Sequence, residues 1–211
     1  MRLIKSCLTM LVLMSAALAG GQASAAIEAG KDYKIVNPAQ PTSTGSKVEV
    51  LEFFFYGCSH CSSLNSFMGA WEQKMPKDVE LIYVPAIFNP TWEVSARTFY
   101  ALEALGQRKQ LHDALFKAWD NKIELVDEAS SANFVSKNGV DRKKFSDAYN
   151  SFAMQSKVTR AKQMQQSYGI RGTPTLIVDG KYLITALHPA DTIRVLTALV
   201  EKARAERSAK K

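Results

Sequence analysis

The stretch LEFFFYGCSHC, residues 51–61, decides the fold of this chain. Residues 47–56 are rich in β-branched and aromatic side chains and become continuously apolar, which predicts a central strand buried on both faces. Residues 62–75 then predict a helix that stops before Pro76. Its apolar side chains at helical spacing are Leu64, Phe67, Met68 and Trp71. The Cys-x-x-Cys motif therefore lies where a strand turns into a helix.

This position predicts a reactive thiol. Cys58, at the helix N-terminus, faces unpaired backbone N–H groups and the positive end of the helix dipole, which favour the thiolate. Cys61 follows on the same helical face, where modest local adjustment allows a disulfide. His60 can add a hydrogen bond or a positive charge to the Cys58 thiolate, which would make the disulfide more oxidising. The motif thus indicates a reversible redox pair.

The alternative interpretation of one Cys-x-x-Cys motif is half of a zinc site. Such a site needs four ligands, usually from a second Cys-x-x-Cys or a downstream His-x-x-x-His, and the sequence contains neither. Cys7 belongs to the leader, and His112 and His188 stand alone in unrelated stretches. We expect these two histidines on helix or loop surfaces, and we expect no metal ion and no cofactor.

Residues 1–25 have the pattern of a secretory signal peptide. Arg2 and Lys5 form a charged start, an apolar core runs over about residues 7–19, and Ala23-Ser24-Ala25 supplies the small-residue cleavage pattern. The core is shorter than the roughly 18 apolar residues that a membrane span needs. We therefore predict export, with cleavage near Ala25/Ala26.

The remaining chain is long enough for one hydrophobic core without covalent braces. A disulfide that closes so short a loop also removes little chain entropy, so the cysteine pair is better suited to chemistry than to stability. The formal net charge of +7 falls to +5 without Arg2 and Lys5, and the basic residues are dispersed apart from a tail at residues 204–211. This favours a solvated surface, and we expect no nucleic-acid partner.

The other elements predict an α/β fold with a helical insertion. Strands are expected at residues 79–84, 175–178 and 181–184, and Asp179-Gly180 suits a type I′ hairpin turn. Between them, helices are expected over residues 89–105, 111–119, 127–137 and 141–168, the last being one long or broken helix, and a final helix over 191–204. This pattern divides the chain into a first part of the α/β domain at 26–87, an inserted helical domain at 88–165, and a second part at 166–211.

Three features together resemble the DsbA family of exported thiol:disulfide oxidoreductases. They are the strand with Cys58-Ser59-His60-Cys61, the helical insertion, and Gly172-Thr173-Pro174 before the hairpin. The resemblance implies a thioredoxin-like fold and a periplasmic protein that donates its disulfide to reduced, newly exported, unfolded proteins. A quinone-linked membrane partner, DsbB, would then reoxidise it.

The resemblance also implies roles for individual residues. Cys58 matches the exposed nucleophile, Cys61 the buried resolving cysteine, and His60 the histidine that steadies the thiolate. Pro174 matches a proline preceded by a cis peptide bond, which would place Thr173 backbone groups beside the sulfurs for pairing with an extended substrate. Ser59 departs from the proline that many members have, which bears on redox strength.

Glu52 is a further candidate, because an acid in a buried apolar strand is costly unless it is paired or protonated. Such a group can shuttle a proton to Cys61. The alternative is a solvated position at a strand edge. Members of the family often have a lysine nearby, but here Tyr83 takes that place.

Two other functions remain open. A disulfide isomerase or reductase would use the same dithiol in its reduced form. Exported isomerases typically carry a dimerisation domain, and about 22 residues between Ala26 and Val48 are too few for one. This favours the oxidant, and we expect a monomer. A peptide-binding module of chaperone type, with an incidental cysteine pair, is the third possibility.

Overall fold

The predicted central strand forms β2 (Val48–Phe54), and all its residues are buried. β2 pairs in parallel with β3 (Val79–Pro85) and antiparallel with β4 (Thr175–Val178). β4 continues through a hairpin into β5 (Tyr182–Thr185), and β1 (Lys34–Ile35) adds to the far side of β5. The strand order is β1-β5-β4-β2-β3. The sequence did not predict β1, because two residues carry no periodicity.

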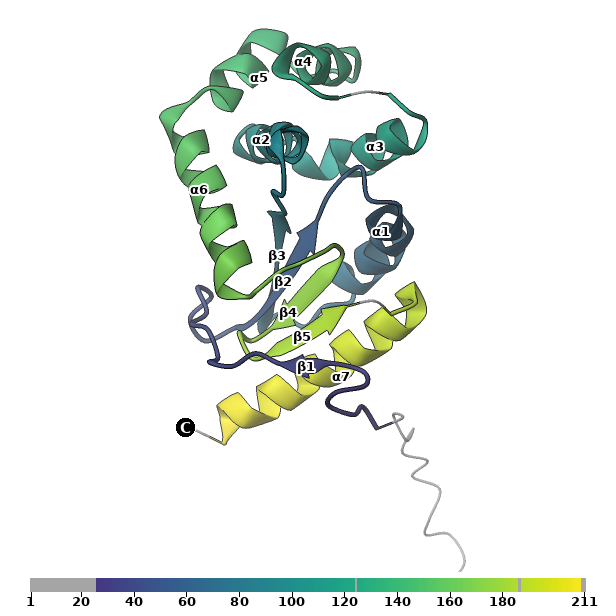
Figure 1. Cartoon of the computed structure of the whole chain (residues 1–211), viewed down its shortest axis with the longest axis vertical. Coiled ribbons are helices and arrows are strands. Elements are labelled where there is room, and N and C mark those ends of the chain that lie inside the picture. The colour runs from purple at the N-terminus through teal and green to yellow at the C-terminus, as the bar shows by residue number, and fades with distance from the viewer. Residues whose placement is uncertain (1–25, 124, 186, 210–211) are drawn as a thin grey trace, which may run out of the picture.

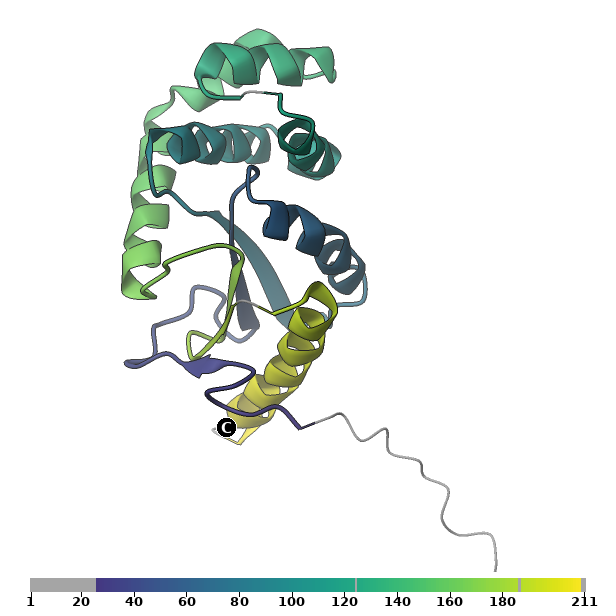
Figure 2. The same ribbon diagram turned by 45° about the vertical axis from the view of Figure 1, so that its right-hand side comes forward.

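The structure is a computed structural model that describes residues 26–209 apart from 124 and 186. The predicted leader and its cleavage site at Ala25/Ala26 lie outside the described residues. Figures 1 and 2 show helices covering both faces of the sheet, with a further group of helices beyond one end of β2 and β3. Among the described helices, none is both long enough and apolar enough to cross a bilayer.

The alternation of β2 side chains builds two cores, one on each face of the sheet. Val48 and Val50 pack with buried residues of α1 (Ser59–Glu72) and α7 (Pro189–Ser208). Leu51 and Phe53 belong to the other core, which the inserted helices complete. The α/β prediction is therefore confirmed.

The inserted helices follow β3 and precede β4. They are α2 (Pro90–Ala104), α3 (Arg108–Asp120), α4 (Glu128–Lys137), α5 (Arg142–Tyr149) and α6 (Phe152–Ser167). The predicted cap at Asn89 is confirmed, because its side chain accepts a hydrogen bond from the Trp92 N–H at 3.1 Å. The segment predicted as one long or broken helix is broken at Asn150–Ser151, and Ser151 caps α6.

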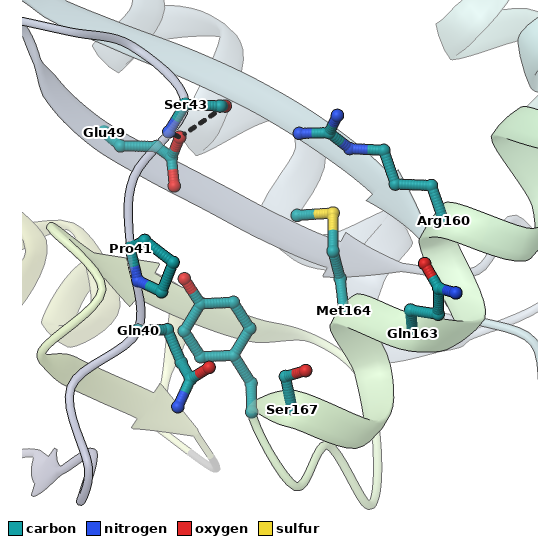
Figure 3. Close-up of a pocket in the computed structure, with 9 residues that line it drawn as sticks. Gln40, Pro41, Ser43, Glu49, Arg160, Gln163, Met164 and Ser167 are labelled. Carbon is teal, nitrogen blue, oxygen red and sulfur yellow. Dashed lines mark hydrogen bonds between the residues drawn. The ribbon is translucent and has the colours of Figure 1, made fainter.

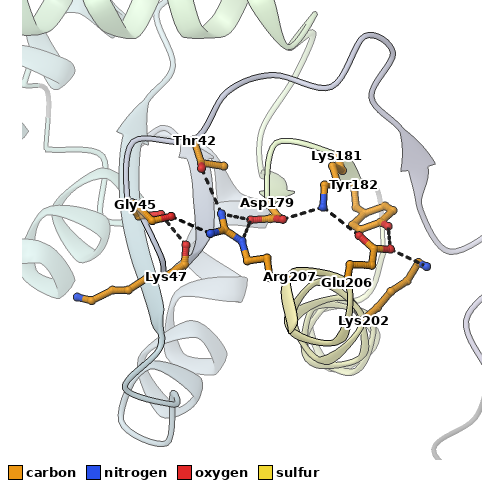
Figure 4. Close-up of polar contacts among 10 residues, drawn as sticks. Thr42, Gly45, Lys47, Asp179, Lys181, Tyr182, Lys202, Glu206 and Arg207 are labelled. Atoms are coloured by element: carbon orange, nitrogen blue, oxygen red, sulfur yellow. Dashed lines mark hydrogen bonds and ion pairs between the residues drawn. The ribbon is translucent and has the colours of Figure 1, made fainter. Parts of the chain in front are cut away.

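Polar contacts hold the hairpin turn between β4 and β5 against the end of α7 (Figure 4). Asp179 and Gly180 both have positive φ, as a type I′ turn requires. The Asp179 carboxylate is buried and accepts from Arg207 Nε at 2.7 Å and from Lys181 Nζ at 2.9 Å. Arg207 also donates to the Gly45 carbonyl at 2.8 Å. The last turns of α7, which extends beyond its predicted end at residue 204, therefore hold β4, β5 and the N-terminal segment together.

Candidate active site

The two cysteines lie at the start of α1, which begins at Ser59, three residues earlier than predicted. Cys58 is the N-cap, and its sulfur accepts a hydrogen bond from the Cys61 N–H at 3.4 Å. Cys58 is partly exposed, whereas Cys61 is fully buried, and both are free thiols here. One sulfur can thus be reached from solvent, and the other only through the first.

The two thiols have opposite electrostatic surroundings. The pKa of Cys58 is lowered to about 5, chiefly by a hydrogen bond from the Cys61 thiol. Burial opposes this shift, and the Thr173 side chain and the backbone N–H groups of Cys61 and His60 reinforce it. Burial, followed by the hydrogen bond and charge of Cys58, raises the pKa of Cys61 far above its usual range. Near neutral pH the reduced pair is therefore one exposed thiolate and one buried thiol.

The loop before β4 completes the site. The Thr173–Pro174 peptide bond is cis, and Cys58 Sγ lies 3.3 Å from the Thr173 carbonyl oxygen. The structure thus brings together the cysteine motif and a loop more than a hundred residues away in the sequence. His60 is exposed, and it acts on the Cys58 sulfur through its backbone N–H group.

A mainly apolar hollow of about 750 Å³ opens beside these residues, and we call it the catalytic groove. Its lining is His60, Ser63, Leu64, Phe67, Gly172, Thr173, Pro174, Thr185, Leu187, His188, Pro189 and Thr192. Phe67 was predicted among the apolar positions of the helix, yet 40% of its surface is exposed and it forms part of the groove wall. Helical spacing alone does not distinguish such a wall from core.

Glu52 is buried in the middle of the sheet, between β3 and β4, with 2% of its surface exposed. The alternative of a solvated strand edge is therefore wrong. Strand alternation places Glu52 on the same face as Val50, which packs against α1. Among the described residues, its Oε2 atom has no hydrogen-bond partner, and burial, with a smaller effect of the Glu72 charge, raises its pKa to about 8.

Glu49, in the same strand, differs from Glu52 in the hydrogen bonds of its carboxylate. Its carboxylate is also buried, but Oε2 accepts from both the backbone N–H and the hydroxyl of Ser43, each at 2.7 Å (Figure 3). It lines a hollow of about 370 Å³ between the N-terminal segment and α6, which shares no residue with the catalytic groove. Of the two acids, only Glu52 has a fully buried carboxylate oxygen without a hydrogen-bond partner in the described part of the chain.

Tyr83 stands directly opposite Glu52 in the β2–β3 register. Its hydroxyl donates to Glu72 Oε2 at 3.3 Å, and the Arg108 guanidinium lies 4.7 Å from its ring centre. Burial, followed by the charges of Glu52 and Glu72, raises the pKa of Tyr83 above its usual range. The neutral phenol of Tyr83 therefore occupies the position near Glu52 at which members of the resembled family often have a lysine.

The prediction that His112 lies on a surface is wrong. His112 is buried in an aromatic cluster, and its Nδ1 lies 2.9 Å from the Tyr56 hydroxyl. Burial lowers its pKa to about 4, so the ring is neutral at physiological pH and Nδ1 can accept the tyrosine proton. This contact ties α3 to the residue two positions before Cys58.

Gly57 is packed so closely that an added methyl group should disturb the turn between β2 and α1, which contains Cys58. A Cβ atom would lie 2.5 Å from a ring carbon of Phe55 and 2.9 Å from one of Trp119. Phe55 is itself stacked on Trp92, with ring centroids 4.0 Å apart. We expect Gly57→Ala to lower the free energy of unfolding by about 1–3 kcal/mol, measured by urea denaturation.

Gly69→Ala is the matched control for this substitution. Gly69 lies inside α1, and in the part of the chain that the structure describes no neighbouring atom lies within 4 Å of its would-be Cβ, so alanine should be neutral or stabilise by about 0.5–1 kcal/mol. If the Gly57 variant proved as stable as the Gly69 variant, the close packing of the turn would be refuted.

Comparison with known proteins identifies the family. A family model described as the DSBA-like thioredoxin domain matches residues 49–201. The thiol:disulfide interchange protein DsbA of Burkholderia cepacia is 40% identical over 176 residues, covering 81% of this chain and 83% of its own. DsbA of Pseudomonas syringae pv. tomato is 36% identical over 205 residues, covering 94% and 96%.

A solved structure agrees with this assignment. The crystal structure of Pseudomonas aeruginosa DsbA superposes with a TM-score of 0.82 at 36% identity, covering 88% of this chain and 97% of the other. The thioredoxin-like fold is thereby confirmed. The chain belongs to the DSBA-like thioredoxin family, and it is a protein disulfide oxidoreductase.

Proposed function

We propose that this protein is a periplasmic, monomeric dithiol oxidase that donates the Cys58–Cys61 disulfide to reduced, unfolded, newly exported proteins. A DsbB-like, quinone-linked membrane oxidase then restores the disulfide. The observation that carries the proposal is the asymmetry of the pair, an exposed Cys58 with a pKa of about 5 beside a buried Cys61 with a raised pKa. A stable thiolate is a good leaving group, and its stability favours the reduced form of the protein.

The reaction proceeds in two exchanges. A substrate thiolate attacks Cys58 Sγ, the S–S bond breaks, and its electron pair leaves with Cys61. A second substrate thiolate then attacks the substrate sulfur of the mixed disulfide, and Cys58 departs as the thiolate. The substrate loses two electrons and two thiol protons as its disulfide forms, and the protein dithiol gains the electrons.

Glu52 supplies the proton that Cys61 needs in the first exchange. A thiolate formed at this buried sulfur is costly, because burial disfavours the charge. With a pKa of about 8, Glu52 is mostly protonated at pH 7 and can donate to Cys61, then recover its proton from solvent. Thr173 and Pro174 hold the substrate chain beside Cys58 by backbone pairing.

Trapping of the mixed disulfide tests the assignment. In Cys61→Ala, a substrate thiolate attacks Cys58 held as its mixed disulfide with glutathione, and glutathione leaves as the thiolate. No Cys61 thiol is then present to release the substrate, so we expect covalent adducts with exported proteins, found by non-reducing electrophoresis and mass spectrometry. Cys58→Ala should form none and should have no oxidase activity. Adducts that form equally in the Cys58 variant, or none in the Cys61 variant, would refute the proposed roles.

The reduction potential separates this function from the alternatives. In graded glutathione buffers, a disulfide donor should equilibrate toward about −120 mV, which is the value of DsbA itself, and a reductase toward about −270 mV, which is the value of thioredoxin. A chaperone-type module would instead bind unfolded peptides equally well without either cysteine.

A further inference from the structure

A second hollow continues from the catalytic groove along the outer surface of α1. It has a volume of about 510 Å³ and lies between α1 and α7; we call it the distal groove. Its lining is Phe67, Ala70, Trp71, Lys74, Pro76, Ile193, Thr197, Val200 and Glu201. Phe67 lines both hollows, so they meet at this exposed side chain.

We propose that the distal groove is a second substrate subsite, which takes an apolar side chain of the polypeptide whose thiol reacts with Cys58. This inference rests on the proposed function. A bound chain would run in extended form from the Thr173–Pro174 loop across Phe67 and place a side chain between α1 and α7. Because the two hollows share Phe67 as a wall, a chain held beside Cys58 is the occupant that the distal groove favours over an unrelated ligand.

The length of α1 fixes which substrate residue reaches the subsite. Trp71 lies eleven positions after His60, which corresponds to about 16 Å along a helix. An extended chain advances about 3.3 Å per residue. A side chain about five residues from the reacting cysteine would therefore meet the distal groove, and one about two residues away would remain in the catalytic groove.

The walls of the distal groove suit an apolar group. Trp71 is 9% exposed, and its indole N–H is already satisfied by the Thr197 hydroxyl at 3.2 Å. The ring therefore offers an apolar, fixed surface with no open hydrogen-bond donor. Ile193 and Ala70 continue this surface, while the charges of Lys74 and Glu201 belong to the same lining. Burial of an apolar side chain here removes its surface from water.

Synthetic peptides of equal length test the proposal. Each carries one cysteine and one leucine, placed two or five residues from the cysteine on either side, in an otherwise polar sequence. The measured quantity is the second-order rate constant of the first exchange, in which the peptide thiolate attacks Cys58, Cys61 leaves, and the mixed disulfide forms; a second peptide thiolate then completes the oxidation. We expect one of the two peptides with leucine at the fifth position to react roughly five-fold faster than a peptide without leucine.

Ala70→Glu is the informative variant, because Ala70 is exposed on α1 and lines only the distal groove. It should abolish the advantage of leucine at the fifth position and leave the reaction of the leucine-free peptide unchanged. Ala153→Glu, at an exposed position of α6 outside both grooves, is the matched control and should change neither rate.

The outcomes distinguish this inference from the proposed function. If wild-type protein oxidises all peptides at equal rates, or if Ala70→Glu slows every peptide equally, the distal subsite is refuted while the oxidase function stands. If wild-type protein oxidises none of them, the oxidase function itself fails.

Discussion

Replacement of Glu52 with glutamine should make the protein more stable by about 3 kcal/mol at pH 7. The pKa of this carboxyl is about 8 in the folded protein, against a reference value of 4.5. Each pKa unit corresponds to about 1.4 kcal/mol, and at pH 7 the unfolded chain ionises Glu52 freely while the folded protein must keep it protonated. Glutamine removes this penalty, because it does not titrate.

The pH dependence of the stability gain in Glu52→Gln shows whether ionisation of Glu52 is its cause. A raised folded-state pKa gives stability that is fully present below pH 4.5 and is lost as the pH rises through about 8. The advantage of Glu52→Gln should therefore be absent near pH 4, grow through pH 5.5 and 7, and level off above pH 8. Urea denaturation of the oxidised form at these pH values measures it without interference from the Cys58 thiol.

Glu49→Gln is the matched control in the same strand. Glu49 accepts two hydrogen bonds from Ser43, so its neutral replacement loses charge-assisted bonds and should destabilise by about 1–3 kcal/mol. Stabilisation of Glu52→Gln by the same amount at every pH would show that polar packing, rather than ionisation, is responsible.

The same variant also tests the proton transfer. If Glu52 is the proton donor, its replacement leaves Cys61 to depart as an uncompensated buried thiolate, so the rate of mixed-disulfide formation should fall at pH 7. Alkylation of Cys58 in the reduced protein needs no proton at Cys61 and should be unaffected. Unchanged substrate kinetics in Glu52→Gln would argue against a shuttle.

Local signals in the sequence predicted the scaffold of the site. A run of apolar and β-branched residues marks β2, the Asn89-Pro90 pair marks the start of α2, and Asp179-Gly180 marks the hairpin. Each depends on neighbours in the sequence, so spacing and residue type suffice. The position of Cys58 at a strand–helix junction follows from the same signals.

Features that depend on distant partners could not be predicted in this way. The burial of His112 depends on Tyr56 and the surrounding aromatic rings, which α3 meets only after the chain has folded. Glu49 and Glu52 both lie among apolar residues in the sequence. Only the tertiary structure shows that Ser43 donates a hydrogen bond to Glu49 and not to Glu52. The exposure of Phe67 likewise depends on where the helix leaves a groove open.

Reduced protein should react with iodoacetamide at Cys58 with a pH midpoint near 5, rather than near the usual value of 9. Cys61 should remain unmodified, because it is buried and protonated. Peptide mapping locates the label, and the rate as a function of pH gives the midpoint. A midpoint near 9 would remove the basis of the proposed oxidase function.

This thiolate should also set the redox strength. A lowered folded-state pKa gives the reduced protein stability that is present above pH 9 and is lost as the pH falls through about 5. At pH 7, which lies two units above the folded pKa of about 5, the stabilisation of the reduced form corresponds to two pKa units. We discount this to about 2 kcal/mol because Cys58 is partly exposed, and it corresponds to about 40 mV toward a stronger oxidant.

Thr173→Val removes one hydrogen bond that lowers the Cys58 pKa, so it should raise the alkylation midpoint and make the disulfide less oxidising. A midpoint that rises without any change in potential would show that the thiolate does not control the redox equilibrium.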